Sequence, residues 1–188
     1  MIAQFRDITD EDLVRDAQQG REEALSLLYE RYLTVVYRRV RYTIPEADVE
    51  DVTQDIFIAM LRSLKGFRGD AQFRTWLRTL TNRAIADYYR HRDMADFQKT
   101  PDWQEEEDEN AFVDQSLSNP VECDDQILVR QALGRLPAHY QEVLLLRFAE
   151  DLPFLEIARQ QGQSLEATKS LFRRAIAMLQ KILEETYA

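Results

Sequence analysis

The sequence has few of the residues that disulfides, metal centres and membrane spans require. It contains one cysteine, Cys123, which excludes an intrachain disulfide and any zinc site built from several cysteines. No apolar run approaches the ~20 residues that cross a bilayer, and the N-terminal segment MIAQFRDITDEDL lacks the apolar stretch of a signal peptide. We therefore expect a cytoplasmic protein that does not insert into a membrane and does not require an oxidising compartment.

Helix-breaking residues are equally scarce. The 188 residues include only five glycines and five prolines, whereas Leu, Ala, Glu, Arg and Gln are abundant. This composition is typical of a mostly helical chain, and the length suffices for one ordinary domain or two small ones. The sequence predicts an all-α fold.

Negative charge is concentrated in one segment. The chain has a net charge of −10, yet residues 1–92 are neutral overall and residues 127–188 carry +1. Residues 93–126 hold one lysine and 12 acids, five of them consecutive from Glu105 to Glu109, which predicts a flexible acidic linker. Because neither flanking segment is basic enough to hold DNA tightly unaided, we expect a partner that keeps the protein on DNA.

Apolar residues recur at helical spacing on both sides of the linker, which predicts two small helical domains, residues 1–92 and 127–188. Thr9 followed by Asp12 is a capping-box pattern, and Gly20 ends the first short helix. The other predicted helices span residues 22–42, 47–64, 73–91, 121–135, 138–149, 153–161 and 165–186.

Aromatic residues and arginines are interleaved in FRGDAQFRTWLRTLTNRAIADYYRHR, residues 67–92. Guanidinium groups pair with phosphates, and flat rings stack on unpaired bases. A helix that carries both, entered through a short glycine-containing loop, favours binding to a strand whose bases are partly unpaired. The pattern is equally consistent with an amphipathic helix whose stripe, including Phe73, Trp76 and Tyr88, only builds the core.

A second motif lies in LPFLEIARQQGQSLEATKSLFRRAIAML, residues 152–179. A short helix, a tight turn at Gly162 and a longer helix predict a helix-turn-helix. We expect Leu171, Ala175 and Met178 to face inward, which leaves a basic face for contacts to the major groove or to phosphates. That face consists of Lys169, Ser170, Arg173 and Arg174. A plain helical hairpin with a solvated basic face is the alternative.

The segment EADVEDVTQDIFIAML, residues 46–61, places Asp48, Asp51 and Asp55 on one helix face beside Gln54. A docking face for a basic protein partner and a merely solvated face are both open. A divalent-metal nuclease is disfavoured, because metal catalysis needs carboxylates that converge from several elements on a pocket. The motifs therefore predict that the protein binds no metal or cofactor and is not an enzyme.

Jointly these motifs resemble those of bacterial extracytoplasmic-function (ECF) sigma factors, group 4 of the sigma-70 family. DVEDVTQDIFIAMLRSLKGFRGDAQFRTWLRTLTNRAIADYYRHR is similar to sigma region 2, and LGRLPAHYQEVLLLRFAEDLPFLEIARQQGQSLEATKSLFRRA is similar to sigma region 4. The resemblance implies a protein that directs core RNA polymerase to specific promoters, promotes melting of the −10 element and is masked by an anti-sigma factor. It also implies that the acidic linker threads toward the channels of the polymerase.

The resemblance also implies roles for individual residues. The residues implied to dock on core polymerase are Asp51, Gln54, Asp55 and Phe57. We add Asp48, which lies on the same acidic face of the helix. Those implied to hold the melted non-template strand of the −10 element are Phe67, Arg68, Gly69, Asp70, Phe73, Trp76, Arg78 and Asn82. Those implied to read the duplex −35 element are Lys169, Ser170, Arg173 and Arg174.

Two departures from the family pattern concern the second domain. Leu171 and Ile176 stand where the family often has basic residues, and residues 163–165 differ from its usual small-residue turn. The exact register of the −35 contacts is therefore left open. A stand-alone helix-turn-helix regulator that binds DNA without polymerase is the alternative function.

Overall fold

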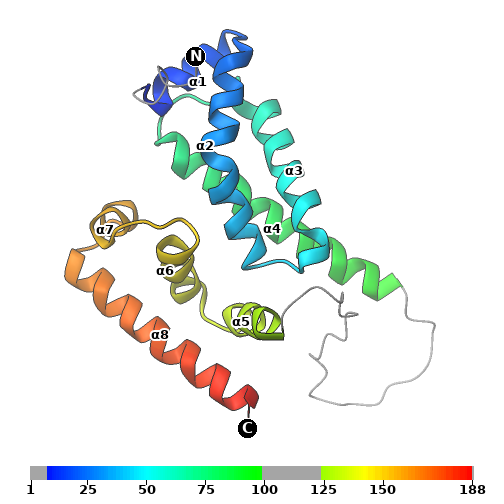
Figure 1. Cartoon of the computed structure of the whole chain (residues 1–188), viewed down its shortest axis with the longest axis vertical. Helices are drawn as coiled ribbons and strands as arrows, with labels where there is room; N and C mark the ends of the chain where they lie inside the picture. Colours follow the sequence, from blue (N-terminus) through cyan, green and yellow to red (C-terminus); the bar gives the residue numbers. More distant parts are fainter. Residues whose placement is uncertain (1–7, 99–123, 188) are drawn as a thin grey trace.

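The computed structural model describes residues 8–98 and 124–187, and all the regular structure within these ranges is helical, as the composition predicts (Figure 1). Four helices form an N-terminal lobe and four form a C-terminal lobe. In chain order they are α1 Asp10–Gln18, α2 Glu22–Arg41, α3 Glu46–Leu64, α4 Phe73–Gln98, α5 Asp124–Gly134, α6 Ala138–Phe148, α7 Phe154–Gln161 and α8 Leu165–Tyr187.

The N-terminal cap of α1 confirms the predicted capping pattern. The Thr9 hydroxyl oxygen accepts a hydrogen bond from the Asp12 backbone N–H at 3.2 Å and donates to the Asp12 carboxylate at 2.8 Å. The chain turns after α1 at Gly20, whose φ of 88° is a conformation that favours glycine. Arg31 and Tyr32 of α2 both donate to the Asp10 carboxylate, which fixes α1 on α2.

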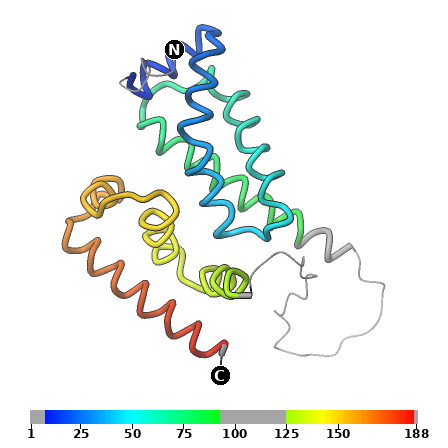
Figure 2. The backbone as a smooth tube through the Cα atoms, viewed as in Figure 1, coloured from blue at the N-terminus to red at the C-terminus, as the bar shows by residue number. Residues whose placement is uncertain are grey.

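The core of the N-terminal lobe lies where α1, α2, α3 and α4 pack together. Apolar side chains at helical spacing on each helix meet there, which is the arrangement that amphipathic helices favour. The largest fully buried side chains of this lobe are Leu13, Leu28, Ile44, Ile56, Met60, Phe73 and Leu77. Figure 2 shows how α2, α3 and α4 run alongside one another in this bundle.

The C-terminal lobe is organised by α8, which packs against α5, α6 and α7. Gly162 ends α7 in the left-handed conformation, with φ of 63°, and so forms the predicted tight turn into α8. Leu171 and Ala175 are buried as predicted. The predicted inward position of Met178 is wrong: its side chain is 38% exposed, because the buried stripe continues through Leu179 and Ile182 instead.

The ends of the predicted linker are helical. Helix α4 continues to Gln98, beyond the predicted end at residue 91, because no proline or glycine interrupts the chain before Pro101. Helix α5 starts at Asp124, and the acid block from Glu105 to Glu109 lies outside the described residues. Within the described ranges, no helix combines the length and apolar character needed to cross a membrane.

Candidate docking and nucleic-acid surfaces

Helix α3 presents a polar face to solvent on the side opposite the core. Asp51, Gln54 and Asp55 are exposed, and we call these three residues the docking face. Val52 and Ile56, which alternate with them along the helix, are buried in the bundle. The docking face is therefore held on a rigid helix by the packing beneath it.

Two residues predicted to belong to this surface, Phe57 and Asp48, lie deeper in the bundle. Phe57 is buried, and its ring packs edge-on against Tyr29 of α2 with a centroid distance of 4.7 Å. Tyr29 is exposed, and so is Leu61, which is 49% exposed one helical turn beyond Phe57. Neither Tyr29 nor Leu61 was predicted from the sequence, although a large apolar residue next to an acidic stripe is the available signal.

Asp48 is half-buried and has a fixed partner. The Tyr88 hydroxyl of α4 donates a hydrogen bond to the Asp48 carboxylate at 2.7 Å. Burial, supported by this hydrogen bond, raises the pKa of Tyr88 to about 12. A tyrosine hydroxyl is already protonated at neutral pH, and the raised pKa keeps this one a donor to Asp48 into the alkaline range.

The acidic residues of α3 do not form a metal site. Among the residues that the structure describes, no three His, Cys, Asp or Glu side chains are grouped closely enough to hold a metal ion. Asp51 and Asp55 are exposed on one helix, whereas Asp48 points to Tyr88. This geometry gives the nuclease alternative no convergent set of ligands.

The loop between α3 and α4 is anchored at its base and open at its tip. The Gln18 amide donates to the carbonyl oxygens of Leu64 at 2.9 Å and Phe67 at 2.8 Å. Arg68, Gly69 and Asp70 are exposed, and Gly69 has a φ of 79°, which favours glycine at this position. Gln18 was not predicted from the sequence, because a single polar residue near a helix end has no local signature.

The aromatic residues of this loop and of α4 divide between core and surface. Phe73 is only 1% exposed, and its ring packs against Tyr32 at a centroid distance of 5.3 Å. Phe67 and Trp76 are half-buried and lie 5.0 Å apart between ring centroids. Phe73 therefore lies beneath the surface that it was predicted to form, because it fills the centre of the bundle, whereas Phe67 and Trp76 pack on the core and remain partly exposed.

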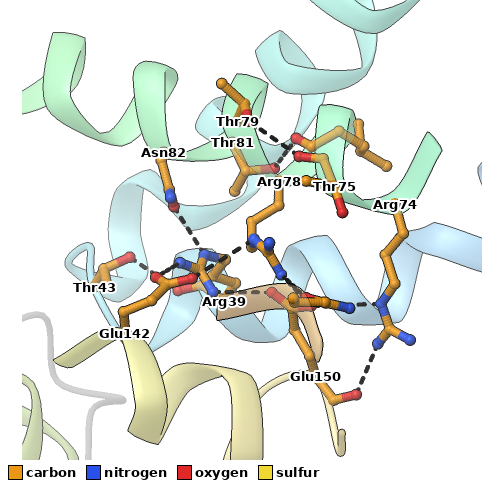
Figure 3. A network of polar contacts seen from close by, with 12 residues as sticks. Arg39, Thr43, Arg74, Thr75, Arg78, Thr79, Thr81, Asn82, Glu142 and Glu150 are labelled. Atoms are coloured by element: carbon orange, nitrogen blue, oxygen red, sulfur yellow. Dashed lines mark hydrogen bonds and ion pairs between the residues drawn. The ribbon is translucent and has the colours of Figure 1, made fainter. Parts of the chain in front are cut away.

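A cluster of charged side chains joins the two lobes (Figure 3). Arg39 of α2 donates to Asn82 of α4 at 2.9 Å, to Glu150 at 2.9 Å and to Glu142 of α6. The Arg39 side chain is only 3% exposed and that of Glu150 only 2%. Three polar partners thus surround one buried guanidinium, two of them from the other lobe.

Two further arginines of α4 complete this cluster. Arg78 lies 3.6 Å from the Glu142 carboxylate and 3.9 Å from that of Glu150. Arg74 donates to the Glu150 carbonyl oxygen at 2.9 Å, and its Nε lies 3.5 Å from the Glu150 carboxylate. We call these five residues, Arg39, Arg74, Arg78, Glu142 and Glu150, the inter-lobe cluster.

Weaker pairs surround the inter-lobe cluster at its rim. Arg38 lies 2.9 Å from Asp151, and Arg41 donates to Gln126 at 3.0 Å. The sequence did not predict that Arg38, Arg39 and Arg41 form one group. Basic residues in the last turn of a helix are common because they complement its dipole, so the sequence alone does not mark them as an interface.

The helix-turn-helix presents its basic residues outward. The Ser164 hydroxyl caps α8 by accepting from the Ala167 backbone N–H at 3.1 Å. Arg173 and Arg174 are exposed on α8. Of the other two predicted −35 residues, Lys169 pairs with Glu166 at 3.0 Å, and Ser170 is half-buried with its carbonyl oxygen facing the Arg174 side chain at 3.4 Å.

Comparison with known protein families follows the division into lobes. The family description Sigma-70 region 2 matches residues 28–94, and Sigma-70, region 4 matches residues 126–179. Together they cover more than half of the chain. The chain belongs to the sigma-70 family. The region 2 match contains the docking face, the loop of Phe67 and most of α4, and the region 4 match contains the helix-turn-helix.

Individual relatives agree with this family. The chain is 30% identical over 176 residues to ECF RNA polymerase sigma factor BldN of Streptomyces coelicolor, with 93% of this chain and 66% of that protein covered. It is 31% identical over 163 residues to RNA polymerase sigma factor YlaC of Bacillus subtilis, with 85% and 90% covered. The sequence resemblance to ECF sigma factors is thereby confirmed.

A solved structure also matches both regions. CnrH, solved in complex with the cytosolic domain of CnrY, is similar over 94% of this chain and 97% of its own, with 27% identity and a TM-score of 0.63. In the present chain the inter-lobe cluster links region 2 to region 4, because Arg39, Arg74 and Arg78 lie in the first match and Glu142 and Glu150 in the second.

Proposed function

We propose that this protein is the promoter-recognition subunit of a bacterial RNA polymerase: it brings the core enzyme to a class of promoters and helps to melt their −10 elements. The observation that carries the proposal is the presence of both sigma regions in one chain, each with a polar surface on a rigid helical core. The proposal assigns the chemistry of RNA synthesis to the core enzyme and not to this chain.

Core polymerase is the proposed partner of the docking face. Exposed carboxylates at Asp51 and Asp55 fit a basic protein surface, and the neighbouring side chains of Tyr29 and Leu61 supply apolar area for the same contact. Phe57 contributes from below by holding the Tyr29 ring edge-on. Asp48 contributes through Tyr88, which anchors α3 to α4.

Charge reversal tests this docking proposal. We expect Asp51→Arg combined with Asp55→Arg to weaken binding to core polymerase by about 100-fold, because like charges would then face each other across the interface. The matched control is Glu184→Arg with Glu185→Arg, which makes the same charge change at exposed positions of α8. Binding measured by fluorescence anisotropy should be unaffected in the control. Equal affinities of both variants and the wild type would contradict the docking role.

The melted −10 strand is the proposed ligand of the loop before α4. Phe67 and Trp76 offer half-buried rings on which an unstacked base can lie, and Arg68 is exposed for a phosphate. Capturing a flipped base offsets an unstacking cost of about a few kcal/mol. Phe73 supports the platform from the core, since its ring lies 5.5 Å from that of Trp76.

The duplex −35 element is the proposed ligand of α8. Arg173 and Arg174 are exposed there, where a guanidinium can reach a guanine edge or a phosphate in the major groove. An anti-sigma factor that covers the two regions is a further proposed partner. Support for it comes from the family and from the similar structure of CnrH, which was solved in complex with the cytosolic domain of CnrY.

In vitro transcription tests the proposed function as a whole. Core polymerase would be supplied with this chain and genomic DNA, and the 5′ ends of the transcripts would be sequenced. We expect a discrete set of start sites that share two upstream sequence elements at one spacing. Transcripts identical to those made by the core enzyme alone would contradict the proposal, and DNA footprints made by the chain without polymerase would favour a stand-alone regulator.

A further inference from the structure

We propose that Arg39 of α2 is a positioning residue for the melted −10 strand: its guanidinium fixes the side-chain amide of Asn82 so that a hydrogen-bond donor faces the strand. The proposal deepens the proposed function and rests on it in one respect, namely that Asn82 contacts the −10 strand. Arg39 is not among the residues for which the resemblance to sigma factors implies a role. Figure 3 shows the Asn82 side chain directed from α4 toward the Arg39 guanidinium.

The contact between Arg39 and Asn82 has only one possible polarity. The Nε of Arg39 lies 2.9 Å from the Oδ1 of Asn82. An arginine side chain carries donors and no acceptor, so the atom of the Asn82 amide that faces it must be the oxygen. The amide group is planar, and its nitrogen, Nδ2, therefore points away from Arg39.

The two residues differ in their access to solvent. Asn82 is exposed on α4, whereas the Arg39 side chain beneath it is only 3% exposed. Within the described residues, the contact with Arg39 is the one hydrogen bond of the Asn82 side chain. The oxygen of the amide is thus turned toward a buried partner, and the two N–H groups of Nδ2 are left for a ligand.

The backbones on both sides of the contact are held by the core of region 2, where α2 packs against α4. Val40, which follows Arg39, is completely buried. Thr81, which precedes Asn82, is 1% exposed, and its hydroxyl donates to the Leu77 carbonyl oxygen at 3.0 Å. The distance between the two side chains is therefore set by rigid helices, as positioning of a binding group requires.

The contact uses an atom of Arg39 that no other partner shares. Nη1 donates to Glu150 at 2.9 Å, and Nη2 donates to Glu142. Nε alone donates to Asn82, and both residues of that pair belong to region 2. Orientation of the Asn82 amide therefore requires no residue of region 4.

The fixed polarity defines the chemistry that Asn82 selects. With its oxygen turned inward, the side chain presents a donor to the strand, and its ligand must be an acceptor. Suitable acceptors are a ring nitrogen or carbonyl oxygen of an unpaired base, or an oxygen of the phosphate or sugar. An amide that could rotate would bind amino groups of bases equally well, so Arg39 narrows the set of groups that Asn82 recognises.

Proton exchange in the free chain tests the contact without DNA. We expect the Nε–H proton of Arg39, followed by nuclear magnetic resonance, to exchange with water at least about tenfold faster in Asn82→Ala than in the wild type. Thr79→Ala, at an exposed position one turn earlier on α4, is the control and should leave the rate unchanged. Equal exchange rates in Asn82→Ala and the wild type would overturn the contact on which the proposal depends.

A double-mutant cycle tests whether Arg39 acts on DNA through Asn82. Holoenzyme would be incubated with single-stranded DNA 10-mers of random sequence, and affinity would be measured for the most enriched oligonucleotide. We expect Arg39→Met to weaken binding about five- to tenfold when Asn82 is present and less than about twofold in an Asn82→Ala background. Arg15→Met, at an exposed arginine of α1, should have no effect in either background. Equal losses in both backgrounds, or no loss in either, would overturn the proposal.

Base preference in the same pool tests the polarity and leaves Arg39 in place. Asn82→Asp keeps an oxygen for Arg39 but replaces the outward nitrogen by a second oxygen. We expect the affinity of this variant to fall at least about tenfold. Enrichment that shifts at one position toward bases with an amino donor would identify a base acceptor, and unchanged enrichment would identify a phosphate or sugar oxygen. Wild-type affinity and enrichment would overturn the proposal.

These outcomes are distinguishable from failure of the proposed function. Holoenzyme that starts transcripts at discrete sites, yet shows no coupling between Arg39 and Asn82, would overturn the positioning role alone. Absence of discrete start sites would count against the proposed function, and proton exchange in the free chain would then still decide whether Arg39 holds the Asn82 amide.

Discussion

Helix α4 of region 2 and helix α8 of region 4 both carry arginines that we propose for DNA, but only α8 leaves them in solvent. Arg173 and Arg174 are exposed, whereas the side chain of Arg78 is 13% exposed and faces Glu142 and Glu150. The surface that we propose to read duplex DNA is thus exposed, whereas the surface that we propose to hold a single strand is partly covered by Glu142 and Glu150.

The aromatic residues of the two lobes differ in a related way. Phe73 of α4 fills the centre of the region 2 bundle and supports the rings of Phe67 and Trp76 above it. In region 4, Phe172 of α8 packs on Phe154 at a centroid distance of 5.0 Å and on Phe148 at 5.7 Å, but each of these three rings is at least partly exposed, so no buried ring supports them. We therefore propose base capture for region 2 only.

The largest expected effect comes from removing the support beneath the platform. Phe73→Ala should lower the free energy of unfolding of region 2 by about 3–5 kcal/mol, because it leaves a cavity in a closed core. Phe148→Ala, at an exposed phenylalanine of region 4, is the matched control and should cost less than about 1 kcal/mol. Urea unfolding followed by tryptophan fluorescence and circular dichroism measures both. If Phe73→Ala were as stable as the wild type, Phe73 would not support the region 2 bundle. The proposed difference between the aromatic residues of α4 and α8 would then be contradicted.

A smaller effect is expected from the exposed arginines of α8. Arg173→Ala with Arg174→Ala should weaken promoter binding by the holoenzyme at least about 30-fold, since each lost contact costs about 1–3 kcal/mol and the two together at least about 2 kcal/mol. Lys181→Ala, also exposed on α8 but two turns further along, should change binding little. Filter binding at fixed salt would measure the difference. If the double variant bound the promoter with full affinity, the proposal that α8 reads the −35 element through these arginines would be contradicted.

The smallest effect concerns the link between α4 and the docking helix. The Tyr88 pKa is raised to about 12 from its ordinary value of 10.0, chiefly by burial, so the folded chain retains this proton where the unfolded chain has lost it. The associated stability is fully present below pH 10 and is lost as pH rises toward 12. Tyr88→Phe should therefore lose less stability than the wild type between these limits in urea titrations. If the stabilities of Tyr88→Phe and the wild type changed with pH in parallel, the buried Tyr88 hydroxyl would not contribute to the packing of α4 on α3.

The sequence predicts local structure well and contacts between distant segments poorly. Helix periodicity, the Thr9 cap and the turn at Gly162 define the helices to within a few residues, apart from the extension of α4 to Gln98. Met178 was misplaced because the buried stripe of α8 drifts around the helix, and a short window does not resolve that drift.

The inter-lobe cluster has no local signature at all. Arg39 and Glu150 each lie next to apolar residues in the sequence, and nothing in either segment identifies the other as its partner. Phe73 illustrates a similar ambiguity, since one aromatic residue at helical spacing fits both a core and a base-stacking surface. Packing of the whole bundle decides between these interpretations, and periodicity does not.

Fluorescence of 2-aminopurine in the non-template strand of a −10 element tests the central claim most directly, because it reports unstacking of the base that region 2 is proposed to hold. We expect a strong rise with holoenzyme, no rise with this chain alone, and a much smaller rise with Asn82→Ala holoenzyme that binds the same promoter equally well. A rise produced by the chain without polymerase, or an undiminished rise with Asn82→Ala, would contradict the account.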